Sequence, residues 1–196
     1  MAKIHSDNKT SKKAVIVKHA ATLFKSKSYT ASSMRELAEM VGVEAPSLYN
    51  HIGSKGELLE EICIKTGNLF TVQIAKINES KATATQKLEV LIRFHITIMA
   101  EKFDEVYVAN HEWKHLQEPH LSVFLNFRRN YEKSLVLLIE QGISNKELRP
   151  VNPYIAVLTI LSAVRGLEFW QRNKKNITKQ ELEDQMVHHL LNGIVL

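Results

Sequence analysis

Residues 32–59 read SSMRELAEMVGVEAPSLYNHIGSKGELL, and this stretch decides the fold of the front of the chain. Its first apolar residues recur every three or four positions: Met34, Leu37, Ala38 and Val41. This spacing predicts an amphipathic helix over residues 33–41. Gly42 then suits the helix end, because glycine adopts left-handed backbone at little cost. A second short helix is expected over residues 45–51, so the stretch is typical of a helix-turn-helix.

The second helix of this pair is expected to have an inner and an outer side. Leu48 and Ile52 are predicted to point inward, and Val43 to fill the angle between the two helices. The outer side is expected to carry small or polar residues: Ala45, Pro46, Ser47, Tyr49, Asn50 and His51. Small side chains permit close approach to a DNA major groove, and Tyr, Asn and His can donate to phosphates and base edges. A lone helical corner would be weak evidence, so the surrounding residues decide.

Those surrounding residues match a known pattern over residues 11–60. Its elements, in chain order, are Ala21-Thr22-Leu23-Phe24, Thr30 to Ser33, Leu37-Ala38, Val41-Gly42-Val43, Leu48-Tyr49-Asn50-His51-Ile52 and Ser54-Lys55-Gly56-Glu57-Leu58. The pattern resembles the DNA-binding domain of the TetR family of transcriptional regulators. The resemblance implies a homodimer on a palindromic operator, with recognition helices in successive major grooves. Repression relieved by a small-molecule ligand is the mode of regulation that it implies.

The resemblance also implies which residues contact DNA. Ser32 and Ser33 would face phosphate at a helix N-terminus, where free backbone amides favour an anion. The DNA backbone would be held by Tyr49, His51 and Lys55. Base readout is left to Ala45, Pro46, Ser47 and Asn50. Three positions depart from the family pattern: Ile52 replaces the usual Phe, Glu44 stands at a usual Ser or Thr cap, and Pro46 occupies a common Gly position. Glu44 brings negative charge toward phosphate, so its role stays open.

Composition agrees with a nucleic-acid partner. The 196 residues are 44% hydrophobic and 24% charged, as in a globular chain of one or two domains. Residues 1–35 carry eight Lys or Arg against one acid, so the positive charge is concentrated at the front. The single cysteine, Cys63, excludes an internal disulfide and is expected to be an inert core thiol. Without a signal segment or a long apolar run, the protein is expected to be cytoplasmic, with no membrane.

Helical punctuation runs through the whole chain, and strand signals are almost absent, which predicts an all-α fold. About nine helices are expected, over residues 11–26, 33–41, 45–51, 54–79, 84–102, 104–116, 119–141, 153–172 and 179–192. Capping boxes mark four starts: Ser33/Glu36, Ser54/Glu57, Thr83/Gln86 and Thr178/Glu181. Asn152-Pro153 marks a fifth, and Gly142 and Gly193 suit helix ends. We expect a three-helix DNA-binding domain over 1–55 and a ligand-binding and dimerisation domain over 56–196.

The last two expected helices suit dimerisation. One face holds Ile155, Leu158, Thr159, Leu161, Ser162, Val164 and Arg165, and the other holds Leu182, Met186, His189 and Leu190. Packed against their symmetry mates, these faces would form a four-helix bundle. On periodicity alone, an ordinary core within one chain explains them almost as well.

The middle helices supply an apolar and aromatic set with a few polar groups. Its members are Phe94, His95, Met99, Phe103, Trp113, Phe124, Phe127, Arg128, Tyr131, Phe169 and Trp170. Such a stripe is more often core than pocket. Three segments carry a further resemblance: Tyr107-Val108-Ala109-Asn110 through HEWKHL, Arg128-Arg129-Asn130-Tyr131-Glu132, and Lys146-Glu147-Leu148-Arg149-Pro150-Val151-Asn152. They resemble the rear domain of TetR regulators that respond to acyl-CoA thioesters of fatty, steroid or aromatic acids. That resemblance implies an apolar tunnel lined by Trp113 and Trp170, with cations near its mouth. The candidate cations are Arg128, Arg165, Arg172 and Lys174.

One motif suggests a different chemistry. His111-Glu112-Trp113-Lys114-His115 fits the HExxH pattern, in which two histidines one helical turn apart hold zinc. A zinc protease also needs a strand beside the helix, and none is readable. It needs a third ligand as well, for which Glu118, His120, His188 and His189 are candidates only by residue type. We therefore expect no enzyme, no cofactor and no bound metal, with a metal-sensing regulator as the alternative.

Overall fold

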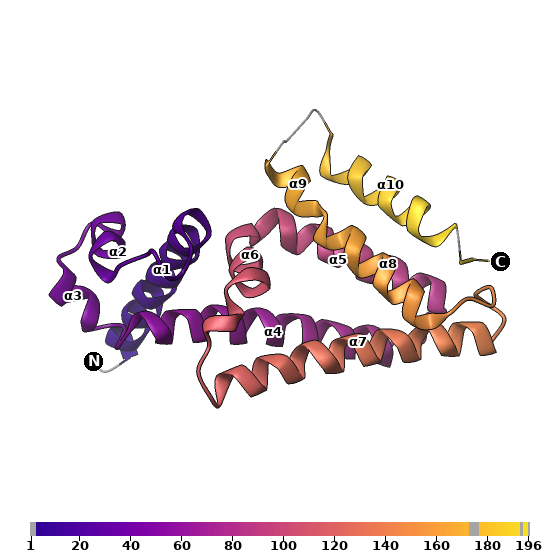
Figure 1. Ribbon diagram of the computed structural model, residues 1–196, viewed down its shortest axis with the longest axis horizontal. Helices are drawn as coiled ribbons and strands as arrows, with labels where there is room; N and C mark the ends of the chain where they lie inside the picture. Colours follow the sequence, from indigo (N-terminus) through magenta and orange to yellow (C-terminus); the bar gives the residue numbers. More distant parts are fainter. Residues whose placement is uncertain (1–2, 173–176, 193, 196) are drawn as a thin grey trace. The chain divides into compact units, whose positions relative to one another are not determined.

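The computed structural model describes residues 3–172, 177–192 and 194–195, and within them every regular element is a helix (Figure 1). The elements are α1 (Lys3–Lys27), α2 (Met34–Val41), α3 (Ala45–Tyr49), α4 (Lys55–Glu79), α5 (Ala84–Glu101), α6 (Phe103–His111), a 3-10 helix η1 (Trp113–His115), α7 (His120–Ser144), α8 (Pro153–Arg165), α9 (Leu167–Arg172) and α10 (Lys179–Leu191). The all-α prediction is confirmed. Across the described ranges, no helix is long and apolar enough to span a membrane.

The helices form two compact units that do not follow the chain in a simple order. Unit 1 comprises Met1–Gly67 and Asp104–Leu125, and unit 2 comprises Asn68–Phe103 and Asn126–Leu196. Helices α4 and α7 therefore each contribute to both units. Each unit is described by itself below.

Unit 1 has an apolar core drawn from both of its chain segments. Helices α1 to α4 supply most of it, including the fully buried Phe24, Leu37, Leu48 and Leu58. The second segment adds Val108, Ala109, Leu116 and Phe124 to the same cluster. Cys63 is completely buried there, and burial raises the pKa of its thiol to about 12, helped by the nearby Glu112 carboxylate. The prediction of an inert core thiol is confirmed by this burial.

In unit 2, helix α5 packs against α8, α9 and α10. The interior is apolar, and its buried members include Leu88, Leu91, Ile92, Ile96, Leu135, Leu138, Ile139, Val157 and Ile160. Arg93 of α5 ties α10 to this core, because its guanidinium lies 2.8 Å from Asp184 and 3.4 Å from Glu183.

The five helix starts that were predicted from capping residues are present, whereas the first helix begins at Lys3 and not at residue 11. Ser33 and Thr83 each form a complete capping box with Glu36 and Gln86. Three further residues accept hydrogen bonds from first-turn amides: Ser54, Asn152 and Thr178. These local interactions satisfy amides that a helix start leaves without partners, which is why they are readable from the sequence.

Two glycines act differently from what was predicted. Helix α7 runs past Gly142 to Ser144, and a Cβ at Gly142 would lie 2.7 Å from the Ala84 Cβ. Gly142 therefore permits close packing rather than ending a helix; Gly193 lies outside the described residues. The expected helix over 153–172 divides at Gly166 into α8 and α9. The backbone of Gly166 is right-handed, so no left-handed turn announces this break.

Candidate functional site

The helix-turn-helix lies in unit 1 and has the predicted local geometry. Ser33 caps α2 through its complete capping box, and Gly42 ends that helix with left-handed backbone at φ 76° and ψ 33°. Lys27, followed by the bonds from Ser33, lowers the pKa of the Glu36 carboxyl to about 2. The capping carboxylate is thus charged at neutral pH. The expectation that Val43 fills the interhelical angle is wrong, since its side chain is 39% exposed.

Helix α3 presents the side chains that the sequence placed outside. Leu48 and Ile52 are buried, as predicted, while Tyr49 is 52% exposed. Pro46, Ser47 and Asn50 are exposed as well, and Ala45 and His51 are half-buried. Glu44 precedes the helix, and its side chain makes no capping bond. The accessible surface of α3 is therefore small at its start and polar at its end.

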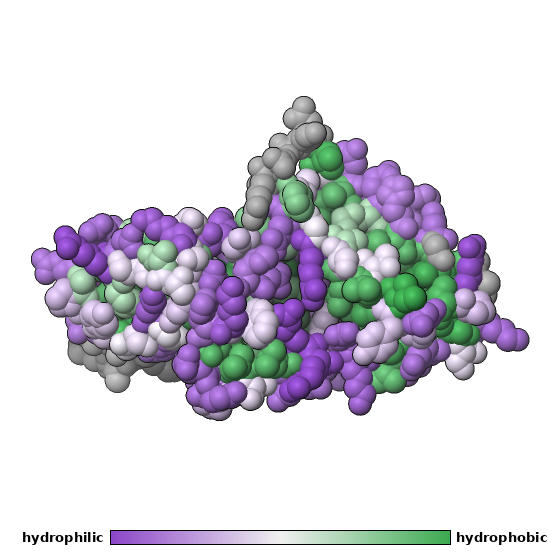
Figure 2. Space-filling view, in the orientation of Figure 1, coloured by the Kyte–Doolittle hydropathy of each residue, from purple (hydrophilic) through white to green (hydrophobic). Residues whose placement is uncertain are grey.

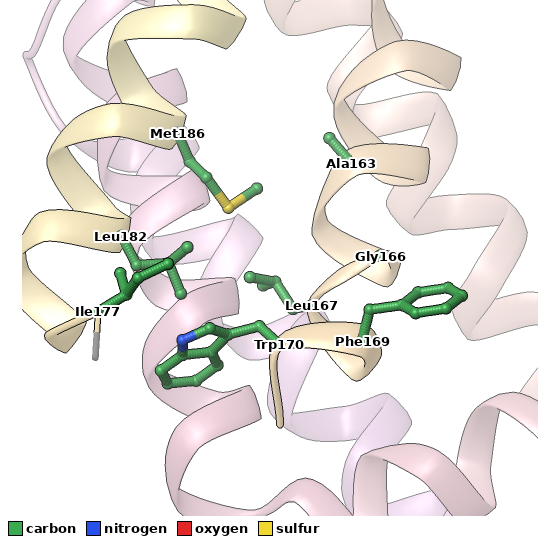
Figure 3. A pocket seen from close by; sticks show the side chains of 8 residues that line it. All are labelled: Ala163, Gly166, Leu167, Phe169, Trp170, Ile177, Leu182 and Met186. Carbon is green, nitrogen blue, oxygen red and sulfur yellow. The ribbon is translucent and has the colours of Figure 1, made fainter. Parts of the chain in front are cut away.

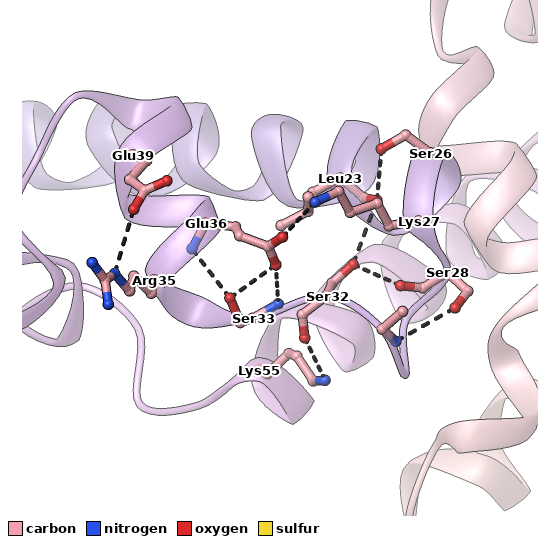
Figure 4. Close-up of polar contacts among 11 residues, drawn as sticks. Leu23, Ser26, Lys27, Ser28, Ser32, Ser33, Arg35, Glu36, Glu39 and Lys55 are labelled. Carbon is pink, nitrogen blue, oxygen red and sulfur yellow. Dashed lines mark hydrogen bonds and ion pairs between the residues drawn. The ribbon is translucent and has the colours of Figure 1, made fainter.

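The loop before α2 is held by hydrogen bonds from two residues that were expected to face phosphate (Figure 4). Ser32 is 4% exposed and donates its hydroxyl to the backbone oxygen of Ser28 over 2.6 Å. Lys55 donates to the backbone oxygens of Tyr29 and Ser32 over 2.9 and 2.8 Å. The expected orientation of the Ser32 side chain is corrected by this burial. Ser33 is exposed, with its hydroxyl 2.8 Å from Glu36.

Tyr29 is a component of this loop that no sequence motif predicted. The Lys55 ammonium lies 4.5 Å from its ring centroid, and the His115 ring stacks on it at 5.4 Å. Burial raises the pKa of the Tyr29 hydroxyl, and the Glu60 carboxylate adds to this effect. No motif marks Tyr29, because its partners are distant in sequence.

The HEWKH segment does not have the geometry of a zinc protease. Helix α6 ends at His111, and η1 begins at Trp113, so the two histidines do not share one α-helix. Instead, His115 Nε2 lies 3.5 Å from an oxygen of the buried Glu112 carboxylate, and the His115 ring stacks on Tyr29. The Trp113 ring packs on Phe124, with their ring centroids 6.4 Å apart. The predicted helix over 104–116 is therefore too long. Among the described residues, no group of three or more His, Cys, Asp or Glu could hold a metal.

A polar pair surrounded by aromatic rings lies in unit 2. His95 Nε2 of α5 and Tyr131 Oη of α7 are 2.7 Å apart. Phe70 of α4 contacts Phe94, His95 and Tyr131, with ring centroids 5.4, 5.0 and 5.9 Å away. Burial lowers the pKa of His95 to about 3, with a smaller contribution from Arg165, and burial raises the pKa of Tyr131. Both side chains are therefore neutral at physiological pH.

Two arginines lie beside this pair. Burial lowers the pKa of the half-buried Arg128, the charge of Arg165 lowers it further, and Glu132 opposes both effects. Arg165 is exposed and is close enough to influence both His95 and Arg128. The charge of Arg165 lowers the pKa of Arg128 because the two like charges lie close together, and the pair forms a local positive field, which favours an anion.

The other expected ligand residues are divided. Trp113 and Phe124 belong to unit 1, so they do not join this cluster within unit 2. Met99 is buried and Phe127 is half-buried in unit 2. The side chain of Arg172 and all of Lys174 lie outside the described part of the chain. Phe70, in the helix expected over residues 54–79, was not among the expected ligand residues.

Phe169 and Trp170 line a separate hollow of about 420 Å³ between α8, α9 and α10 (Figure 3). Its other walls are apolar: Ala163, Gly166, Leu167, Ile177, Leu182 and Met186. The indole Nε1 of Trp170 is buried and has no hydrogen-bond partner within the described residues. Phe169 is 74% exposed at the edge of this hollow.

An apolar surface extends over α8, α9 and α10 (Figure 2). Ile155 and Leu158 are 62% and 64% exposed, and Tyr154 and Phe169 are exposed on the same helices. Val164, which was expected on the dimer face, is buried within unit 2 instead. Exposed apolar side chains that gather in one place are typical of a protein–protein interface.

Two family models match the chain. The family model described as "Tetracyclin repressor-like, C-terminal domain" matches residues 81–194, more than half of the chain, and "Bacterial regulatory proteins, tetR family" matches residues 16–62. The chain belongs to the TetR family. TetR proteins are DNA-binding transcriptional regulators that act as homodimers. The predicted membership is confirmed.

Individual TetR relatives span nearly the whole chain. The transcriptional repressor KstR2 of Mycobacterium tuberculosis is 25% identical over 186 residues, which cover 94% of this chain and 93% of KstR2. The solved structure of that regulator has a TM-score of 0.87 at 22% identity, covering 94% of this chain and 95% of its own. AibR, solved with isovaleryl coenzyme A and operator DNA, has a TM-score of 0.78 at 24% identity, covering 90% and 96%. The structural likenesses show a shared TetR fold.

Proposed function

We propose that the chain is a ligand-responsive repressor that leaves a palindromic operator when an acyl-CoA thioester binds in unit 2. The observation that carries the effector proposal is the pairing of Arg128 and Arg165 with a neutral, aromatic-lined polar pair. Such a thioester joins an apolar acyl group to a polyanionic nucleotide, so it needs an apolar site near cations. The complex of AibR with an acyl-CoA and operator DNA is a precedent within the fold.

For DNA binding, we propose that α3 enters the major groove. The exposed Tyr49 and the half-buried His51 would contact the DNA backbone, and Ala45, Pro46, Ser47 and Asn50 would read bases. Ser33 would lie near phosphate at the start of α2. Ser32 and Lys55 would act by fixing the loop, with the Lys55 ammonium keeping one hydrogen for phosphate.

We further propose that residues 1–55 act as the DNA-binding domain and residues 56–196 as the ligand-binding and dimerisation domain. The exposed apolar surface of α8 and α9 would meet its symmetry mate, because a two-fold interface pairs the same patch on both subunits. Leu182, Met186, His189 and Leu190 of α10 would border that interface.

Operator binding is tested first, by fluorescence anisotropy with the promoter nearest the protein's own gene. We expect sequence-specific binding that Tyr49→Ala weakens by about 30-fold or more, because a backbone contact in the recognition helix is lost. Glu140→Ala, an exposed change in unit 2, is the control. Equal affinity of the Tyr49→Ala variant would contradict the assignment of α3.

The effector is tested by titrating the operator complex with short, long, alicyclic and aromatic acyl-CoAs. Release by at least one thioester, weakened about tenfold by Arg165→Gln, is the expected result, since one charge-assisted contact is removed. If no thioester releases DNA, the effector class is wrong. Release that instead follows added zinc and is lost in His111→Ala would favour the metal-sensing alternative.

A further inference from the structure

His95 and Tyr131 are unusual in their surroundings. Their neighbours on α5 and α7 include Leu91, Ile92 and Leu135, all of which are fully buried. A polar pair in an apolar interior is less favourable than a pair of apolar side chains unless its hydrogen bonds are well satisfied. This cost suggests that the pair has a function beyond packing.

The one hydrogen bond between them leaves part of their capacity unused. If the Tyr131 hydroxyl donates to His95 Nε2, the other ring nitrogen of His95 keeps its N–H. If His95 Nε2 donates instead, the Tyr131 hydroxyl keeps its hydrogen. In either case one donor is left for another partner. Within the described ranges, neither side chain has a further hydrogen-bond partner. Both side chains also keep part of their surface accessible, so a ligand atom can reach them.

The charge state of the pair restricts that ligand atom. His95 stays neutral because it is half-buried among apolar side chains, which lowers its pKa, and because it is close to the positive Arg165. A neutral hydroxyl-imidazole pair can exchange its donor and acceptor roles by a change of tautomer. It therefore suits a neutral oxygen, which donates or accepts one hydrogen bond. An anionic group is better served by Arg128 and Arg165.

The aromatic walls show what carries this oxygen. Phe70 contacts both members of the pair, and the Phe94 ring lies 5.4 Å from Phe70 and 6.2 Å from His95. These rings make the surroundings of the pair apolar, so the part of a ligand that reaches the pair should be a hydrocarbon or ring, with the polar pair meeting one position on it. The oxygen is thus a substituent within the apolar part of the ligand.

We propose that the His95–Tyr131 pair selects effectors whose acyl group carries a hydroxyl or keto oxygen. This inference rests on the thioester class proposed above and specifies its acyl part. A site built to hydrogen-bond a substituent discriminates against an analogue that lacks it, because the buried polar groups are then left unpaired. The pair acts as a determinant of specificity, not of affinity for all thioesters.

The test uses three acyl-CoAs with the same carbon skeleton: unsubstituted, hydroxylated and keto-substituted. Each is titrated into the operator complex and, by calorimetry, into DNA-free protein. We expect the hydroxyl or the keto thioester to act at about tenfold lower concentration than the unsubstituted one. The difference between those two substituents identifies which form the pair prefers.

Two variants separate selection from support of the fold. Tyr131→Phe and the double variant His95→Leu/Tyr131→Phe should bring the three thioesters to within about twofold of one another. The double variant leaves neither partner unpaired, so it protects the test against misfolding. Tyr107→Phe is the matched control, because Tyr107 is another tyrosine beside a histidine, with its ring 4.3 Å from His111 in unit 1. It should leave the preference of the native protein unchanged.

The outcomes are distinguishable. Equal action of the three thioesters on the native protein overturns this inference and leaves the proposed function intact. A preference that survives in both variants also overturns it. If none of the three binds or releases DNA, the proposed thioester class is wrong, and the inference falls with it.

Discussion

The two units use their polar side chains differently. In unit 1, Ser32 and Lys55 bond to backbone oxygens of the loop before α2, and their positions are fixed by it. In unit 2, the His95–Tyr131 pair keeps hydrogen-bonding capacity, and Phe169 keeps most of its surface exposed. Unit 1 is thus built to hold a surface in one shape. Unit 2 keeps groups that a ligand or a second subunit would contact in the functions proposed above.

Truncation of one core residue in each unit should change the free energy of unfolding most. Leu48→Ala in unit 1 and Leu91→Ala in unit 2 each remove a fully buried side chain, so each should lower the free energy of unfolding by about 2–5 kcal/mol. Hydrogen exchange by mass spectrometry would locate the loss. We expect faster exchange confined to the unit that carries the change. Equal acceleration in both units would mean that they unfold as one.

Acid should affect unit 2 through His95. The folded pKa of this group is about 3, against 6.5 for an unperturbed histidine. Below pH 6.5 the unfolded chain takes up a proton there that the folded chain refuses, so stability falls as pH drops, by up to about 1.4 kcal/mol per pH unit. Urea unfolding of native protein and His95→Gln, between about pH 7 and pH 4, measures this slope. The variant should show a shallower loss, and parallel slopes would contradict the assignment.

Substitution of one glycine in each unit tests how tightly that unit is packed. A Cβ at Gly142 would lie 2.7 Å from Ala84 and Leu148, whereas one at Gly56 would meet nothing closer than 3.6 Å. Gly142→Ala should therefore destabilise by about 1–3 kcal/mol, and Gly56→Ala should gain up to about 1 kcal/mol from helix propensity. Thermal unfolding would show shifts of opposite sign. A stabilised Gly142→Ala variant would mean that Ala84 and Leu148 can move aside to accommodate the added methyl group.

Helix caps give the smallest effect. Ser33 in unit 1 and Thr83 in unit 2 both form complete capping boxes, so Ser33→Ala and Thr83→Ala should each lower the free energy of unfolding by about 1 kcal/mol. Ser33→Ala should in addition weaken operator binding. If Thr83→Ala weakens operator binding equally, the loss comes from stability and not from the proposed position of Ser33 near DNA.

Local signals in the sequence predicted much of this structure. Ser33, Thr83 and Asn152 mark helix starts because a cap needs only neighbouring residues. The surface of α3 was predictable for the same reason, since helical spacing alone separates Leu48 from Tyr49. Family resemblance supplied the expected DNA contacts and the effector class, which stay predictions.

What the sequence could not give depends on distant partners. The end of α6 at His111 has no local signal, because residues in a 3-10 turn keep almost helical backbone and spacing. Tyr29 and Phe70 acquire their surroundings from His115 and from Tyr131, respectively, far along the chain. Gly142 was misread because glycine suits both a helix end and a close approach, and only the position of Ala84 decides between them.

The chain leaves unit 1 after Gly67 and returns to it at Asp104. During synthesis, the ribosome must therefore deliver the rest of α4 and all of α5 before Val108, Leu116 and Phe124 can reach their places in the apolar cluster. The nascent DNA-binding end waits with part of its apolar surface uncovered, a state in which chains are prone to aggregate. A fragment that stops at residue 67 would keep this apolar surface exposed permanently. The DNA-binding domain should therefore be produced as a part of the full chain.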